Sequence, residues 1–161
     1  VSKQAFHWQD VKSAQEMFEA ASKIHAEMDI CVFAAAVADY APAEIAPEKI
    51  KKSDATLSIS LAKNIDIAAS LGEKKRPNQV HIGFALETEN EAKNAQSKLS
   101  KKNFDMIVLN STKEYGAGFQ LDTNKVHVFH ASGLSIESEV APKNQIASLI
   151  IDQIKNIPVW V

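Results

Sequence analysis

A set of acidic and basic side chains near one apolar strand has the chemistry of a phosphate-binding site. The run Ile30–Phe33 is typical of a buried parallel strand, and the small residues of Ala34–Tyr40 follow it. Small residues at a strand's carboxyl end let a ligand approach the backbone, and open α/β sheets bind ligands at that edge. Asp39 places a carboxylate there, and the lysines of residues 49–52 follow within reach. This pattern predicts a site for a polyphosphate that carries a polar sugar or base.

Lysines of two segments are candidates for holding phosphates. Lys49 follows Pro47 in a predicted loop, and either a solvated charge run or a mobile flap that clamps a triphosphate explains it. Lys98 and Lys102 are one helical turn apart and therefore share a helix face. The dipole favours cations at the C-terminus of any helix, which is the simpler explanation. The functional alternative is that two parallel ammonium groups bridge adjacent phosphates.

The remaining candidate residues have weaker signals. Phe84, at the end of a second apolar strand, is either a core residue or a stacking surface for a base. Asp39 binds Mg²⁺, accepts a hydrogen bond from the nucleoside, or caps a turn. The single cysteine, Cys31, lies in the first strand and reads as a small buried hydrophobe. The histidines show no trusted metal-ligand spacing, and two of them, His127 and His130, are expected on the surface of an edge hairpin.

Composition indicates an ordinary globular protein. The chain has 161 residues, of which 45% are hydrophobic and 24% charged, and a formal net charge of -2. This charge gives no global argument for a nucleic-acid or membrane partner. No apolar run approaches the roughly 18 residues of a membrane span, and the single cysteine fits a reducing, cytoplasmic location. No glycine lies in a G-x-G-x-x-G or Walker pattern. If phosphates bind, either lysine side chains make many of the contacts or a missing segment supplies the loop.

The periodicity predicts alternating strands and helices followed by an antiparallel meander. Ser13 and Glu16 form a capping box, and Asn64 is a plausible N-cap. The fold class is α/β: a Rossmann-like three-layer sandwich with a mostly parallel sheet and a C-terminal antiparallel meander at the edge. The expected helices are 12–27, 65–74, 89–103 and 143–156, and the expected strands are 29–36, 57–61, 80–85, 105–109, 119–121, 125–130 and 136–140.

The ordered set of segments resembles phosphopantothenate–cysteine ligase, also called phosphopantothenoylcysteine synthetase, of coenzyme A biosynthesis. No single segment is specific, but their order and spacing are family-like from about Lys12 to Ile154. The matching segments are Ala34–Tyr40, Ala46–Lys52, Lys63–Ile67, Gly83–Thr88, Lys98, Lys102–Asp105 and Asn110.

The resemblance implies a ligase that joins 4'-phosphopantothenate to cysteine through an acyl-cytidylate made from CTP, with Mg²⁺. It also implies a homodimer and, in many bacteria, fusion to a flavin-dependent decarboxylase. By position, Lys49 would be the main catalytic group and Ala35 would allow close approach of the substrate. The nucleotide-binding residues it implies are Asp39, Lys49, Asn64, Ile65, Asp66, Ile67, Ala68, Phe84, Lys98 and Lys102.

The sequence departs from the family pattern in two places. Ile65 stands where the family usually has proline, and the family's N-terminal portion, with its glycine-containing nucleotide loop, has no counterpart before Val1. We therefore expect residues 1–161 to form a single, N-terminally truncated ligase domain that by itself binds nucleotide poorly and does not turn over. Two other functions stay open: a non-catalytic nucleotide-binding or interaction domain, and a Rossmann oxidoreductase that has lost its glycine loop. The choice between CTP and ATP also stays open.

Overall fold

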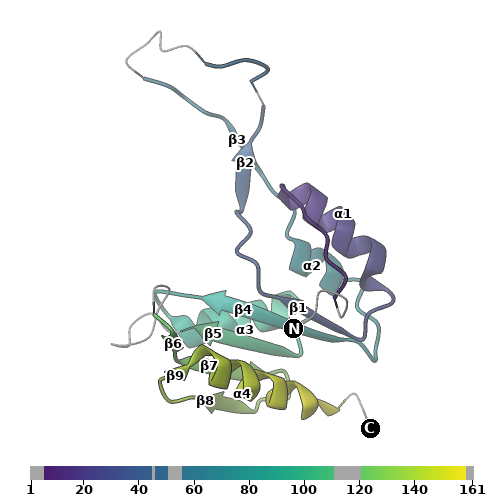
Figure 1. The fold of residues 1–161 in the computed structure, drawn as a ribbon, viewed down its shortest axis with the longest axis vertical. Coiled ribbons are helices and arrows are strands. Elements are labelled where there is room, and N and C mark those ends of the chain that lie inside the picture. Colours follow the sequence, from purple (N-terminus) through teal and green to yellow (C-terminus); the bar gives the residue numbers. More distant parts are fainter. Residues whose placement is uncertain (1–5, 45, 51–55, 111–120, 159–161) are drawn as a thin grey trace.

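The centre of the molecule is a mixed five-stranded sheet with strand order β1-β4-β5-β7-β8 (Figure 1). The computed structural model describes residues 6–44, 46–50, 56–110 and 121–158. Neighbours among β1, β4 and β5 pair in parallel, whereas β7 and β8 extend the sheet in antiparallel fashion. The predicted α/β class with an antiparallel edge is confirmed. The strands are β1 Ile30–Phe33, β4 Val80–Leu86, β5 Met106–Asn110, β7 Val126–His130 and β8 Ser135–Glu137.

Helices cover the two faces of the sheet because successive strand residues point to opposite sides. On one face, valines and isoleucines of β4, β5 and β7 pack against α4, Lys143–Lys155. On the other face, Ile107, Leu109 and Phe129 pack against α3, Glu91–Lys101. Two further helices, α1 (Ala14–His25) and α2 (Ile67–Gly72), lie together beside the β1 end of the sheet (Figure 1). None of the helices in the described ranges has the length and apolar character needed to cross a membrane.

The helix starts differ in part from those expected. Ser13 is the N-cap of α1, as predicted, and its hydroxyl accepts a hydrogen bond from the Glu16 amide at 3.1 Å. The N-cap of α2, however, is Asp66 and not Asn64. The side-chain amide of Asn64 donates to the Ala38 carbonyl at 2.8 Å, so Asn64 joins two loops and does not begin the helix.

Strand β1 is shorter and more exposed than predicted. It ends at Phe33, and the predicted continuation to Ala36 leaves the sheet. Among the described strands β1 pairs only with β4, so its other edge has no partner there. Val32 is consequently 53% exposed although its sequence reads as a buried strand. A continuous apolar run predicts buried side chains for a strand in the centre of a sheet, whereas β1 lies at the edge.

A two-stranded arm, made of β2 (Tyr40–Pro42) and β3 (Leu61–Lys63), projects away from the sheet (Figure 1). The strand predicted over 57–61 is therefore wrong except at Leu61, because no described element covers either side of 57–60. At the other end of the molecule, β6 (Thr123–Asn124) pairs with β9 (Ala141–Pro142). Of the strand expected at 119–121, residues 119–120 lie outside the described residues.

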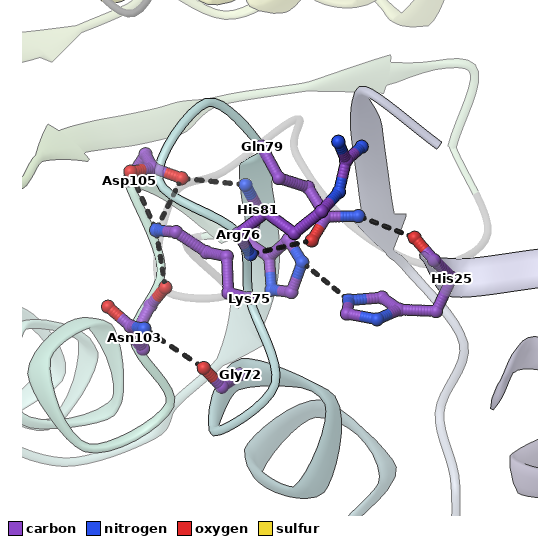
Figure 2. A network of polar contacts seen from close by, with 8 residues as sticks. All are labelled: His25, Gly72, Lys75, Arg76, Gln79, His81, Asn103 and Asp105. Atoms are coloured by element: carbon purple, nitrogen blue, oxygen red, sulfur yellow. Dashed lines mark hydrogen bonds and ion pairs between the residues drawn. The ribbon is translucent and has the colours of Figure 1, made fainter. Parts of the chain in front are cut away.

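A network of mostly part-buried polar groups fixes the amino-terminal edge of the sheet (Figure 2). The Asp105 carboxylate accepts hydrogen bonds from Lys75 Nζ, at 2.8 and 2.9 Å, and from the His81 amide at 2.7 Å. Lys75 Nζ also donates to the Asn103 carbonyl at 2.9 Å. The side-chain amide of Asn103 in turn donates to the Gly72 carbonyl at 2.9 Å. These bonds tie the end of α2 to the starts of β4 and β5.

Three histidine rings are buried: His25, His81 and His130. The expectation that His130 lies on the surface is wrong, because β8 and α4 flank β7 and leave it 7% exposed (Figure 1). Burial lowers the pKa of His25 and of His130. Burial, reinforced by the His25 and Lys75 charges, lowers the pKa of His81 to about 4. All three rings are therefore neutral at physiological pH.

Candidate functional site

A cleft of about 820 Å³ lies where β1 ends, between α1, α2 and the lysine-bearing face of α3. This is the carboxyl edge at which open α/β sheets bind ligands. The cleft brings together segments that are far apart in the sequence. Among the residues predicted for the site, those that line it are Ala35, Asp39, Asn64, Ile65, Asp66, Ile67, Ala68, Phe84, Lys98 and Lys102.

The floor of the cleft is formed by two loops that are hydrogen-bonded to each other. The Asn64 side chain donates to the Ala38 carbonyl at 2.8 Å, and the Asn64 amide donates to the Asp39 carbonyl at 2.8 Å. The segment that leaves β1 is thereby held against the segment that enters α2. Ala35 and Asp39, on the segment that these contacts hold, both line the cleft.

The two helical lysines are paired with carboxylates at the rim of the cleft. Lys98 Nζ lies 2.6 Å from Glu87 Oε1, and Lys102 Nζ lies 2.9 Å from Asp66 Oδ2. The lysine side chains are 45% and 27% exposed. Partly exposed ion pairs are worth only about 0–1 kcal/mol, so an incoming polyanion can displace them. The pairs hold the ammonium groups in place without blocking anion binding.

Asp66 is held as a carboxylate by its surroundings. Partial burial raises its pKa, but the hydrogen bond from the Ala69 amide and the contact with Lys102 outweigh that effect and lower the pKa overall. The Ala69 amide donates to Asp66 Oδ1 at 3.0 Å, which is the N-cap bond of α2. Asp66 therefore both starts the helix and orients Lys102.

Asp39 and Lys49 are placed differently. The Asp39 carboxylate lines the cleft, and no ion-pair partner for it is found in the part of the chain that the structure describes. Lys49 is exposed and lies beyond β2, outside the set of described residues that line the cleft. Lys51 and Lys52, the rest of the basic run, lie outside the described residues. The structure thus brings the predicted residues together with the exception of Lys49.

An apolar wall of the cleft was missed by sequence reasoning. Met17, Ala21, Ile24 and Met28, on and just after α1, line the cleft together with Phe33. Their helical spacing reads as a core-facing stripe, and nothing in the spacing distinguishes a core from a cleft wall. The only signal in the sequence was the presence of two methionines and an alanine on this stripe, because small and flexible side chains can leave room for a ligand.

Comparison with known proteins gives the chain its family. Residues 2–157 match the family described as DNA/pantothenate metabolism flavoprotein C-terminal domain. The chain belongs to this family. The match covers nearly all of the described structure, and it confirms the resemblance to the phosphopantothenoylcysteine synthetase domain that the ordered motifs indicated.

Individual relatives are similar over most of this chain. A cysteine/cysteine sulfinic acid decarboxylase from an unknown prokaryotic organism is 46% identical over 145 residues, which are 90% of this chain and 40% of that protein. The coenzyme A biosynthesis bifunctional protein CoaBC of Bacillus subtilis (strain 168) is 39% identical over 144 residues, 89% of this chain and 35% of the relative. The chain therefore spans well under half of these relatives, and each has a further part outside the match.

A solved structure supports the fold and the family together. The crystal structure of the C-terminal domain of coenzyme A biosynthesis bifunctional protein CoaBC superimposes with a TM-score of 0.72 at 37% identity. It covers 91% of this chain and 65% of that chain. The mixed sheet and its flanking helices are thus shared with this C-terminal domain.

Proposed function

We propose that the cleft binds a nucleoside triphosphate for a phosphopantothenate–cysteine ligase, with CTP as the nucleotide. One observation carries the proposal: the loops after β1 and before α2 meet the lysine face of α3 around a single cleft. The cleft offers a small-residue wall, carboxylate and amide groups for a nucleoside, and ammonium groups for phosphates. The family and the relatives in coenzyme A biosynthesis support the substrate class.

In the proposed reaction, a carboxylate oxygen of 4'-phosphopantothenate attacks the α-phosphorus of CTP, and pyrophosphate leaves. The cysteine amine then attacks the acyl carbon of the acyl-cytidylate, loses a proton to solvent, and releases CMP. Lys98 and Lys102 hold phosphate oxygens, and Lys49 offsets the negative charge that builds up at the α-phosphate. Ala35 leaves space for the substrate beside the strand end.

Asp39 is the residue that fits a magnesium ion best among the described carboxylates of the cleft. Asp66 already accepts bonds from Ala69 and Lys102, and Glu87 pairs with Lys98. Mg²⁺ usually takes one or two carboxylates and completes its shell with phosphate oxygens and water, and when bound it neutralises the phosphates. The same Asp39 carboxylate can instead accept a hydrogen bond from the nucleoside.

The catalytic part of the proposal is tested by pyrophosphate release from the full-length protein. We expect release to require both CTP and 4'-phosphopantothenate, and to be lost in Lys49→Gln while the fold is kept. Lys12→Gln, at an exposed lysine that is not among the described lining residues, is the matched control. Unchanged turnover in Lys49→Gln would remove the catalytic role of that residue.

One observation favours a second function, nucleotide binding without catalysis. Lys49 does not line the cleft in the described structure, so the proposed catalytic group is not in place there. A domain of this kind would bind CTP with Lys98 and Lys102 but release no pyrophosphate under any combination of substrates. The release assay therefore separates the two functions directly.

A further inference from the structure

A second group of chemically active side chains lies at the other end of the cleft. Cys31 on β1 and His81 on β4 are register partners in parallel strands, so their side chains point to the same face of the sheet. His25, the last residue of α1, lies next to both side chains. Figure 2 shows the rings of His25 and His81 directed at each other, with Nε2 atoms 3.0 Å apart.

We propose that His25, Cys31 and His81 form a binding site for one transition-metal ion of the zinc class. One donor atom from each residue lies within 4.8 Å of the other two. Imidazole nitrogen and thiolate sulfur are the donors that such ions prefer, and the harder magnesium ion of the nucleotide chemistry would not choose them.

The distances suit a metal that binds with little rearrangement. A zinc ion with nitrogen ligands at about 2.0–2.1 Å and tetrahedral angles separates two nitrogens by about 3.3 Å. The observed separation of 3.0 Å is already close to this value. A Zn–S bond of about 2.3 Å places sulfur about 3.6 Å from each nitrogen. The donor atoms lie within 4.8 Å of one another, so the sulfur–nitrogen distances need to shorten by no more than about 1.2 Å.

The surroundings favour a site over a simple packing contact. His25 is 5% and His81 0% exposed, and the His81 ring also contacts Phe33 at 5.3 Å between centroids. In a hydrogen bond between two neutral imidazoles, one Nε2–H donates to the other Nε2, so the N–H of the accepting ring needs a further partner. A metal would engage both Nε2 lone pairs at once, with the ring protons on the two Nδ1 atoms.

The site would be open on one side. His25 and Cys31 line the cleft, whereas His81 lies behind them. Three protein ligands with a fourth position open to a cleft is the arrangement of zinc sites that bind an exchangeable water or ligand. Gln79 supports the shell: its Nε2 donates to the His25 carbonyl at 2.6 Å and lies 3.8 Å from Cys31 Sγ.

Two nearby cationic side chains lower the affinity of the site for a metal ion. Arg76 lies next to the group, where its Nη2 donates to the Met28 carbonyl at 3.0 Å, and Lys75 is held by Asp105. These charges repel a divalent ion. The thiolate that forms at Cys31 on binding offsets one unit of the metal's charge. The proton lost from the thiol is released to solvent.

Cobalt(II) titration of the full chain tests the site. We expect one equivalent of Co²⁺ to bind, with thiolate-to-cobalt absorption in the near ultraviolet, and Zn²⁺ to displace it and raise the melting temperature. Cys31→Ser should abolish the thiolate band, and His25→Gln should weaken binding by at least about tenfold, as loss of a direct ligand exceeds the usual effect of a supporting residue. His127→Gln, on the outlying β7–β8 hairpin, should match the unchanged protein.

Both ligand variants are expected to fold, so a loss of metal binding reports on the site and not on unfolding. His25 ends a helix and Cys31 lies on an edge strand, and both substitutions nearly preserve size; circular dichroism checks that they fold. Absence of stoichiometric Co²⁺ binding would overturn the proposal. So would a thiolate band that survives in Cys31→Ser, binding unaffected in His25→Gln, or equal loss in His127→Gln.

Discussion

At the residue scale, the candidate cleft is a case in which side-chain chemistry and position agree. Parallel strands end at a common edge, so polar groups after separate strands were expected to meet. Asp39, after β1, lies at this edge, and Asn64 and Asp66 reach it from the segment that joins the arm strand β3 to α2. The sequence could not predict the carboxylate partners of Lys98 and Lys102, because Glu87 and Asp66 approach them through the packing of α3 against the sheet and α2.

The His25–Cys31–His81 group was missed for a related reason. Its members are spaced by 6 and 50 residues in the chain, which matches no metal-ligand motif. Only the parallel register of β1 and β4 puts Cys31 beside His81, and register is not visible in a single sequence. A buried-looking cysteine and a histidine within an apolar strand were the only signals.

Asn64 provides the first prediction at this scale. Asn64→Ala removes the side-chain bond to the Ala38 carbonyl, which contributes about 1 kcal/mol. We expect a small loss of stability and a larger relative loss of CTP affinity, because the cleft floor is no longer held in one conformation. Thermal denaturation and calorimetric titration measure the two effects. Asn144→Ala, at an exposed helix start, is the control, and an equal change in CTP affinity there would contradict the role of Asn64.

Gly83 provides the second prediction. A Cβ at this position would lie 2.2 Å from Phe104 Cε2, so Gly83 makes room for the Phe104 ring over β4. Gly83→Ala should destabilise the protein by about 1–3 kcal/mol, the usual effect of overpacking. In a double-mutant cycle, Phe104→Leu should be less destabilising in the Gly83→Ala background than alone. Strict additivity in urea denaturation would show that the ring and the glycine are not coupled.

At the scale of elements, the sequence predicted the helices and strands that have one face packed in the core, and it failed for the arm, which has no such face among the described residues. The order of helices and strands follows from apolar periodicity, and the α3 and α4 faces that pack on the sheet were recognisable. The run 57–61 has the alternation of a strand, yet only Leu61 belongs to one, and Ser60 adds a single hydrogen bond from the Ala43 amide to its carbonyl. Alternation specifies a strand when one face is buried, and the arm has no such face in the described structure.

The link between α2, β4 and β5 depends on one carboxylate. Asp105 is 18% exposed and accepts bonds from Lys75 and from the His81 amide. Asp105→Asn leaves Lys75, 11% exposed, without its counter-charge, which should lower the free energy of unfolding by about 3 kcal/mol. Asp152→Asn breaks an exposed pair with Lys155 and should change it by less than about 1 kcal/mol. Chemical denaturation measures the loss of unfolding free energy in the two variants. Similar losses would contradict the stabilising role of Asp105.

At the scale of the whole molecule, buried neutral histidines make stability depend on pH. Burial lowers the pKa of His130 in the folded state, whereas the unfolded chain binds a proton near pH 6.5. Below that pH the unfolded state binds more protons, so stability should fall as pH falls and be unaffected by this group above it. His130→Asn should therefore give a shallower decline in unfolding free energy between pH 6.5 and 5. An unchanged slope would contradict burial of the neutral ring.

The molecule as a whole combines a confirmed family, a sheet edge with a cleft, and lysines on the cleft rim. What sequence reasoning could not supply is the position of Lys49 relative to that cleft, because a loop's path is not encoded in periodicity. The proposed triphosphate site therefore depends most on Lys98 and Lys102, whose positions the structure gives.

The most direct test is calorimetric titration of CTP into the full-length protein and into lysine variants. Lys98→Gln and Lys102→Gln should each weaken CTP binding by about tenfold, the loss expected for one charge-assisted bond. The double variant should lose more, and Lys101→Gln, on the same helix but away from the cleft, should bind as tightly as the unchanged protein. CTP binding that is unaffected in the double variant, or reduced equally in Lys101→Gln, would contradict a triphosphate site on this edge of the sheet.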